Sequence, residues 1–226
     1  MRIANPHGPE ATTTAGQFAT SPLAAEAELC APVGCPYFRG MASVVVEFSA
    51  QEPERLARWW ADVLGWHLDT RAGTVVQPTG PGVPLRFVGS ARAKTRKNGV
   101  HLDLRSESHD EQNRIVERLF NAGARFADID QSSDVPWVVM ADVEGNELCV
   151  LEPRKVYADT GPVAAVVIDT SDPRSDARTI ATATGMELAG ERSEFASLRP
   201  PSGEGPFLEF LESESGPEGM LRVLVE

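Results

Sequence analysis

The 226-residue chain contains 42% hydrophobic residues, enough to bury a core in one or two domains, which excludes disorder throughout. Its formal net charge of −12 argues against nucleic acid or an anionic membrane as a partner, because both need a concentrated basic surface. No apolar run approaches the roughly 20 residues of a membrane helix, and no secretion signal is readable at the N-terminus.

Residues 1–40 mix Ala, Thr, Pro and Gly without helical or strand periodicity, which predicts a flexible extension. Either Met1 or Met41 could be the true start of the protein. The three cysteines, Cys30, Cys35 and Cys149, form no even disulfide framework, and the first two lack the second ligand pair of a zinc site. This cysteine usage predicts a reducing, cytoplasmic location.

The first ordered elements follow the order strand, helix and three strands. A β-branched run predicts a strand at residues 43–48, and Pro53 with acidic neighbours predicts a helix that ends at Gly65. Gly and Pro turns then separate three further strands, which are expected at 67–70, 74–77 and 85–88. The first unit is therefore a βαβββ module.

The same order of elements returns after a short basic cluster at residues 92–97, which we expect to be a solvated loop that could also attract an anionic ligand. A strand at 100–104 precedes a capping box formed by Ser108 and Glu111, and the helix that follows ends at Gly123. The remaining strands of this second module are expected at 125–129, 137–141 and 147–151.

A third module shows the clearest sign of an internal repeat. A strand is expected at 163–168, and Pro173 and Gly185 then stand 120 residues after Pro53 and Gly65. Two more strands are expected at 195–198 and 207–211. We therefore predict a two-module domain at 41–157, followed at 158–226 by a third module without a partner inside the chain.

Three segments together resemble one known family. They are "EPERLARWWADVLGW" (52–66), "KNGVHLDLR" (97–105) and "MADVEGNELCVLEP" (140–153), and they are similar to the glyoxalase-like branch of the vicinal oxygen chelate superfamily. The resemblance implies an α+β fold in which two βαβββ modules form a curved eight-stranded sheet around a cup that holds the ligand. It covers residues 43–154 well and 163–212 more weakly.

The resemblance also implies where a metal would bind. Metal-dependent relatives take ligands from the first, fourth, fifth and eighth strands of the pair, typically His, Glu or Gln, His and Glu. His101 matches the fifth-strand position, whereas the others fall near Val45, Arg86 and Cys149. We therefore expect no cofactor and no complete metal site, with a divalent metal as the less favoured alternative. Glu209 resembles a fourth-strand metal glutamate but is expected to be an ordinary strand residue.

Alternation along "KNGVHLDLR" places His101, Asp103 and Arg105 on one face of a strand. The residues that we expect to line the cup are His101, Asp103, Arg105, Arg86, Glu47 and Cys149. The alternative is that these groups only pair with one another on a polar sheet surface. Cys149 is expected to act as a small apolar filler rather than as a nucleophile.

Three functions remain open from the sequence. The first is a protein that binds a small organic molecule in a polar cup without a complete metal site. The second is a metal-dependent lyase, isomerase or dioxygenase that acts on a small metabolite. The third is a non-catalytic scaffold whose third module associates through its unpaired sheet edge. This module either docks on residues 43–154 of the same chain or, as we favour, forms a homodimer with residues 220–225 as a possible added strand.

Overall fold

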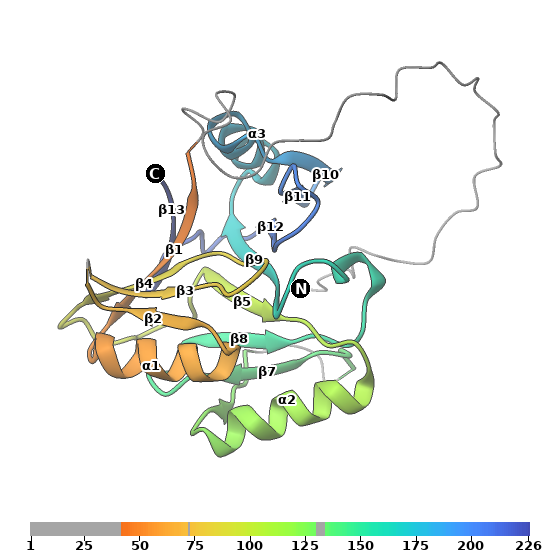
Figure 1. The fold of residues 1–226 in the computed structure, drawn as a ribbon. Coiled ribbons are helices and arrows are strands. Elements are labelled where there is room, and N and C mark those ends of the chain that lie inside the picture. The colour runs from red at the N-terminus through yellow and green to blue at the C-terminus, as the bar shows by residue number, and fades with distance from the viewer. Residues whose placement is uncertain (1–41, 72, 130–133) are drawn as a thin grey trace, which may run out of the picture. The chain divides into compact units, whose positions relative to one another are not determined.

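The computed structural model describes residues 42–71, 73–129 and 134–226, in which three βαβββ modules are followed by a last strand (Figure 1). The predictions on residues 1–40, including Cys30 and Cys35, lie outside the described residues. Within them, no helix is both long enough and apolar enough to cross a membrane.

The modules contain the elements that the sequence predicts and one strand more. The first has β1 (Val44–Ala50), α1 (Pro53–Leu64), β2 (His67–Asp69), β3 (Thr74–Gln77) and β4 (Leu85–Gly89). The second has β5 (Val100–Leu104), α2 (His109–Asn121), β6 (Arg125–Phe126), β7 (Val138–Ala141) and β8 (Glu147–Val150). After a short 3-10 helix, η2 (Lys155–Tyr157), the third has β9 (Val163–Thr170), α3 (Pro173–Thr184), β10 (Glu187–Arg192), β11 (Phe195–Arg199) and β12 (Phe207–Glu212). Strand β10 was not predicted, because most of its residues are exposed and it lacks an apolar pattern.

Helix ends confirm the signals read from the sequence. Gly65 and Gly185 follow α1 and α3 with φ of 67° and 70°, the left-handed conformation that glycine adopts without a steric penalty. At the start of α2, the Ser108 side chain accepts a hydrogen bond from the Glu111 N–H at 3.2 Å. The Glu111 carboxylate accepts the N–H of Glu107, which lies one residue before the Ser108 N–H that a standard capping box uses.

The pairing of modules differs from the prediction. Two modules share an eight-stranded sheet, as expected, but they are the second and third, in the order β10-β11-β12-β9-β5-β8-β7-β6. Strands β5 and β9 join the halves in antiparallel pairing, with His101 opposite Val167. Every residue of β9 is buried, so this strand needs a neighbour on each side, and β12 and β5 supply them. The unpaired module is therefore the first.

The first module forms a separate five-stranded sheet with the order β13-β1-β4-β3-β2. Its added strand is β13 (Leu221–Val225), which pairs antiparallel with β1 and places Arg222 opposite Glu47. The sequence suggested this segment as an added strand in a dimer. Instead, β13 pairs with β1 of the same chain. It covers the edge of β1 that is equivalent, in the second module, to the edge of β5 that pairs with β9.

The helices cover one face of the eight-stranded sheet, where α2 contacts β6 and β8 and α3 contacts β10, β11 and β12. Leu102 and Leu104 of β5 point to this side and join the main core, together with the buried Ile115 and Leu119 of α2. The adjacent Phe120 is 48% exposed and lies against Phe126. We call the opposite side, which carries His101, Asp103, Cys149 and Glu209, the polar face.

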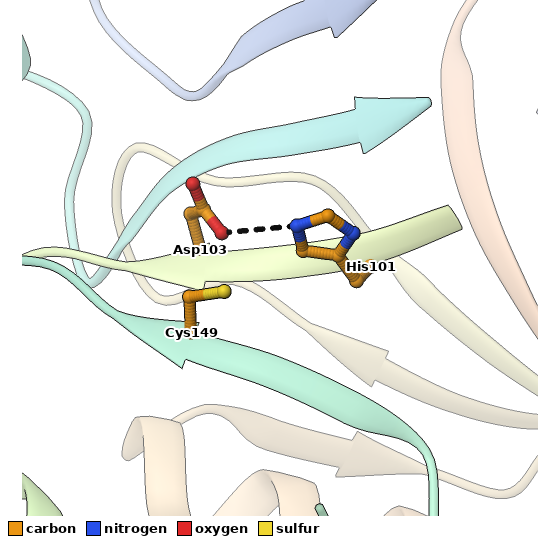
Figure 2. Close-up of side chains that lie close together, drawn as sticks. All are labelled: His101, Asp103 and Cys149. Carbon is orange, nitrogen blue, oxygen red and sulfur yellow. Dashed lines mark ion pairs between the residues drawn. The ribbon is translucent and has the colours of Figure 1, made fainter. Parts of the chain in front are cut away.

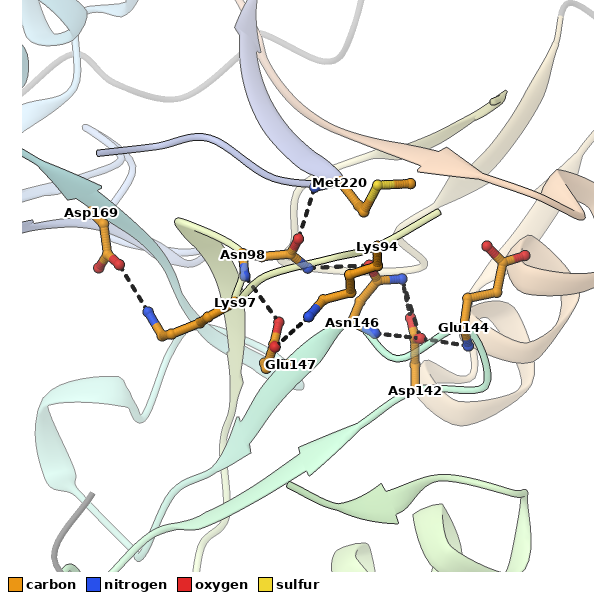
Figure 3. A network of polar contacts seen from close by, with 9 residues as sticks. All are labelled: Lys94, Lys97, Asn98, Asp142, Glu144, Asn146, Glu147, Asp169 and Met220. Atoms are coloured by element: carbon orange, nitrogen blue, oxygen red, sulfur yellow. Dashed lines mark hydrogen bonds and ion pairs between the residues drawn. The ribbon is translucent and has the colours of Figure 1, made fainter. Parts of the chain in front are cut away.

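The buried side-chain amide of Asn98 links the turn between β7 and β8 to the residue that precedes β13 (Figure 3). Asn98 accepts a hydrogen bond from the Met220 N–H at 2.7 Å and donates one to the Asn146 side chain at 3.1 Å. Asn146 in turn donates to Asp142, which also accepts the indole N–H of Trp60 on α1. These bonds tie together four segments that are distant in the sequence, around residues 60, 98, 142–146 and 220.

The turn between β7 and β8 has a structural role. The carboxylate of Glu144 accepts the backbone N–H groups of Gln51 and Glu52, at 2.8 and 2.9 Å. These N–H groups lie just before α1, where a carboxylate is favourable. The second module therefore stabilises the first turn of the helix of the first module.

The basic cluster at 92–97 is a mostly exposed loop, as expected, but its cations form ion pairs with distant parts of the chain. Lys94 pairs with Glu147 at 2.5 Å, Lys97 pairs with Asp169 at 2.8 Å, and Arg96 pairs with Glu218. The three cations thus reach the second module, the third module and the segment before β13. Sequence alone could not show this, because each acidic partner lies 53 or more residues away.

Candidate functional site

The polar face is built by the alternation of strand residues. In β5, Val100, Leu102 and Leu104 face the helices, so His101 and Asp103 point to the other side. Strand β8 adds Cys149 opposite Asp103, and β12 adds Glu209 opposite Val167 of β9. Four central strands of the sheet therefore contribute to one surface.

His101, Asp103 and Cys149 lie side by side at the centre of this face (Figure 2). His101 Nε2 is 3.4 Å from Asp103 Oδ1, and ligand atoms of all three residues lie within 4.8 Å of one another. Among the described residues, His101 Nδ1 and Asp103 Oδ1 are the buried side-chain atoms that have no hydrogen-bond partner. Buried polar atoms in proteins are usually bonded, so this pair is exceptional.

Glu209 lies nearby and is bound by a tyrosine from the linker between the paired modules. The Tyr157 hydroxyl donates to Glu209 Oε1 at 2.7 Å. The pKa of Glu209 is raised to about 7, mainly by burial and to a smaller extent by the charge of Asp103. The hydrogen bond from Tyr157 acts in the opposite direction. Glu209 can therefore gain or lose a proton near neutral pH, which is what acid–base chemistry requires.

The Cys149 thiol is buried and is not activated as a nucleophile. Burial raises its pKa well above the ordinary value, and the neighbouring Asp103 raises it further. The thiol therefore stays protonated at neutral pH, which argues against a nucleophile. Its side chain packs in the small apolar cluster of the polar face with Tyr157, Val167 and Phe207, as expected of a filler.

Ion pairs and aromatic rings surround this centre. Arg154 pairs with Glu152 at 2.6 Å, and its guanidinium lies 5.8 Å from the ring centroid of Trp137 and 5.9 Å from that of Tyr157. Such distances are those of cation–π contacts. The rings therefore already accept a positive charge at the edge of the polar face.

Arg105, the third polar residue predicted on β5, binds the linker rather than pointing to the centre. It donates to the carbonyl oxygen of Ala158 at 2.6 Å and pairs with Glu107. Because Tyr157 precedes Ala158, this contact helps to hold the tyrosine that binds Glu209. Arg105 is therefore a positioning residue of the face.

Two of the predicted cup residues lie elsewhere. Glu47 is on β1 and Arg86 on β4, and both strands belong to the five-stranded sheet. Glu47 accepts a hydrogen bond from Arg222 Nε at 2.7 Å, and Arg86 binds Glu226 through bonds of 2.5 and 2.7 Å. Their prediction as neighbours of His101 was wrong, because it assumed that the first and second modules share a sheet.

The roles of Glu209, Tyr157 and Arg154 on the polar face do not follow from the sequence. Glu209 is expected from the sequence to be an ordinary strand residue, because the third module is expected to lack a partner. The 120-residue repeat was the available signal, since it already made 207–211 a fourth strand. Tyr157 and Arg154 follow β8 in a segment without periodicity, and nothing in the sequence shows that this segment folds over the polar face.

The residues of this face supply only part of the metal-ligand set that the resemblance implies. With the observed pairing, the four ligand strands are β5, β8, β9 and β12. His101 on β5 and Glu209 on β12 offer donors, but Val167 on β9 offers none. On β8, Glu147 is bound by Lys94 and the Cys149 thiol is protonated. Glu209 also lies outside the close group formed by His101, Asp103 and Cys149.

Comparison with known proteins agrees with this fold. Residues 43–151 match the model of the family described as glyoxalase-like domain. Glyoxalase I from Zea mays is 13% identical with a TM-score of 0.55, and the alignment covers 81% of this chain and 73% of that chain. A putative dioxygenase from Bacillus subtilis is 16% identical with a TM-score of 0.48, and 82% of this chain and 66% of that one are covered. No curated protein sequence matches. Residues 43–151, just under half of the chain, thus match a glyoxalase-like domain, and the likeness to glyoxalase I supports the fold alone; both are consistent with the resemblance to the vicinal oxygen chelate superfamily.

Proposed function

We propose that the chain binds a small organic molecule on the polar face, around His101, Asp103 and Glu209. The observation that carries this proposal is the pair of buried atoms, His101 Nδ1 and Asp103 Oδ1, that have no hydrogen-bond partner among the described residues. A buried polar group without a partner is costly, and a bound molecule would supply the missing partners.

The surroundings of these atoms support a small-molecule site. Apolar and aromatic side chains, including Tyr157, Val167 and Phe207, lie beside a few polar groups. Sites for small ligands commonly have this composition. The net charge of −12 favours such a ligand over nucleic acid or an anionic membrane.

Ligand-induced stabilisation tests the proposal. Purified full-length protein is screened by thermal shift against small metabolites, and each hit is measured again on His101→Ala and Asp103→Asn. Arg86→Gln serves as the control, because Arg86 lies on the other sheet. Hits should lose their stabilising effect in the first two variants and keep it in the control. Hits that stabilise all three variants equally would place the site elsewhere.

The second candidate is a metal-dependent lyase, isomerase or dioxygenase. The observation in its favour is that metal-binding atoms of His101, Asp103 and Cys149 lie within 4.8 Å of one another. We propose the metal-free function first, because the ligand set is incomplete. Plasma emission spectrometry of the purified protein should show no stoichiometric metal. One equivalent that disappears in His101→Ala would reverse the order of the two candidates.

A cytoplasmic location and a homodimer through the third module stay predictions. The dimer was expected because the third module seemed to lack a partner. In the structure, β5 of the same chain occupies the edge of β9, so a dimer would have to use another surface of this module. Sedimentation velocity of the full chain measures its oligomeric state directly.

A further inference from the structure

The cations around the polar face are already neutralised. Four ion pairs involve residues of β5, β8, β9 or the segments next to them: Lys94 with Glu147, Lys97 with Asp169, Arg154 with Glu152, and Arg105 with Glu107. Each lysine or arginine in this set therefore has its own carboxylate.

The centre of the face is different. Asp103 and Glu209 are 7% and 4% exposed, and in the described parts of the chain neither forms an ion pair with a lysine or an arginine. Asp103 has His101 Nε2 at 3.4 Å, and Glu209 has the neutral Tyr157 hydroxyl. After burial itself, Asp103 is a further cause of the raised pKa of Cys149, Tyr157 and Glu209. Arg154 lowers the same three pKa values, in each case by less than Asp103 raises them, so it offsets only part of the effect of Asp103.

From this arrangement we infer that the ligand of the polar face carries a positively charged nitrogen, which lies against the carboxylates of Asp103 and Glu209. The inference rests on the proposed function and specifies the class of molecule. Buried carboxylates without a lysine or arginine partner are unfavourable, and a cationic group that donates hydrogen bonds would neutralise them and bond to Asp103 Oδ1, which has no hydrogen-bond partner among the described residues. A neutral or anionic ligand would leave that charge unbalanced.

The neighbouring side chains favour an organic ammonium over a bare metal ion. Val167, Phe207 and the ring of Tyr157 form an apolar wall next to the carboxylates. An alkyl or aryl body can pack on this wall while its nitrogen meets the acids, whereas a hydrated metal ion gains nothing from it. Trp137 and Tyr157 already hold the Arg154 guanidinium, so cations are accepted beside these rings.

The test uses matched probes on the full chain. Three bodies of increasing size, methyl, benzyl and naphthylmethyl, are each tested as ammonium, alcohol and carboxylate by calorimetry in the presence of a chelator. In at least one size, the ammonium should bind at least tenfold more tightly than the alcohol and the carboxylate. Asp103→Asn and Glu209→Gln should each reduce that preference, and Arg86→Gln on the other sheet should leave it unchanged.

The outcomes separate this inference from the proposed function. If no ammonium binds more tightly than its alcohol, the inference fails, while metabolite hits that depend on His101 would still support a site on the polar face. If divalent metal alone binds in the absence of chelator, requires His101 and Asp103, and no ammonium binds, the cation is a metal and the inference also fails. If the preference survives both Asp103→Asn and Glu209→Gln, the positive group binds elsewhere and the inference is wrong.

Discussion

Both sheets carry buried carboxylates, but only those at the centre of the eight-stranded sheet have no lysine or arginine partner among the described residues. On the five-stranded sheet, Glu47 is held by Arg222, and Arg86 binds Glu226 and lowers its pKa. On the eight-stranded sheet, Asp103 and Glu209 have no arginine or lysine partner in the described residues, and the pKa of Glu209 is raised. Glu147 and Asp169 of the same sheet are paired with Lys94 and Lys97, so the acids without a basic partner are confined to the centre of the polar face. A bound ligand could supply their counter-charge.

The largest expected effect comes from removing the third module. A chain that ends at Tyr157 loses four strands of the eight-stranded sheet and also β13. Strands β5 and β1 would both expose an edge, and the main core would lose Val166, Ile168 and Leu208. We expect no cooperative unfolding transition by circular dichroism, whereas the full chain should show one. A shortened chain with a normal transition would mean that the first two modules fold without the third.

The second prediction concerns the helix face of the eight-stranded sheet. Leu119 of α2 is fully buried, so Leu119→Ala should lower the free energy of unfolding by roughly 2 to 5 kcal/mol. Its neighbour Phe120 is 48% exposed, and Phe120→Ala should cost clearly less. Urea unfolding of both variants gives the comparison. Equal losses would show that the orientation of α2 differs from the one described.

The third prediction uses the raised pKa of Glu209, which is about 7 in the folded protein against an ordinary value of 4.5. Between these values the folded state binds more protons than the unfolded state, so stability is highest at low pH and falls as pH rises through 7. The loss attributable to this group is about 3 kcal/mol. Unfolding of the unmodified protein and of Glu209→Gln, measured from pH 4.5 to 7.5, should show a flatter profile for the variant. Parallel profiles would mean that Glu209 titrates normally.

The smallest effects should differ in sign between the two sheets. Glu47→Gln removes the partner of Arg222 and should lower the free energy of unfolding by about 1 to 2 kcal/mol, since the arginine is mostly exposed and can turn to solvent. Asp103→Asn removes an unbalanced buried charge and should leave stability unchanged or raise it. Denaturant midpoints of the two variants decide the comparison. A loss at Asp103 as large as that at Glu47 would mean that Asp103 already has a stabilising partner.

Local patterns in the sequence were sufficient to predict the three modules and half of the site residues. Alternation in β5 placed His101 and Asp103 on one face, and the Pro53/Gly65 and Pro173/Gly185 landmarks gave helix bounds that the structure confirms. What failed was the choice of strand partners. The pairing of β1 with β13 joins residues 175 positions apart, as the Glu47–Arg222 contact shows, and no local pattern encodes it. Glu209 was therefore undervalued and Arg86 was placed on the wrong sheet.

The position of β13 has a consequence for how this chain folds during synthesis. Strand β13, which covers the edge of β1, is synthesised long after it, because paired residues such as Glu47 and Arg222 lie 175 positions apart. Contacts over such a long sequence separation form slowly, because loop closure must precede them. Until then, the nascent first module exposes a β-branched strand edge that can pair with other chains. We therefore expect slow translation and chaperone assistance to increase the yield of native protein, and fast overexpression to favour inclusion bodies.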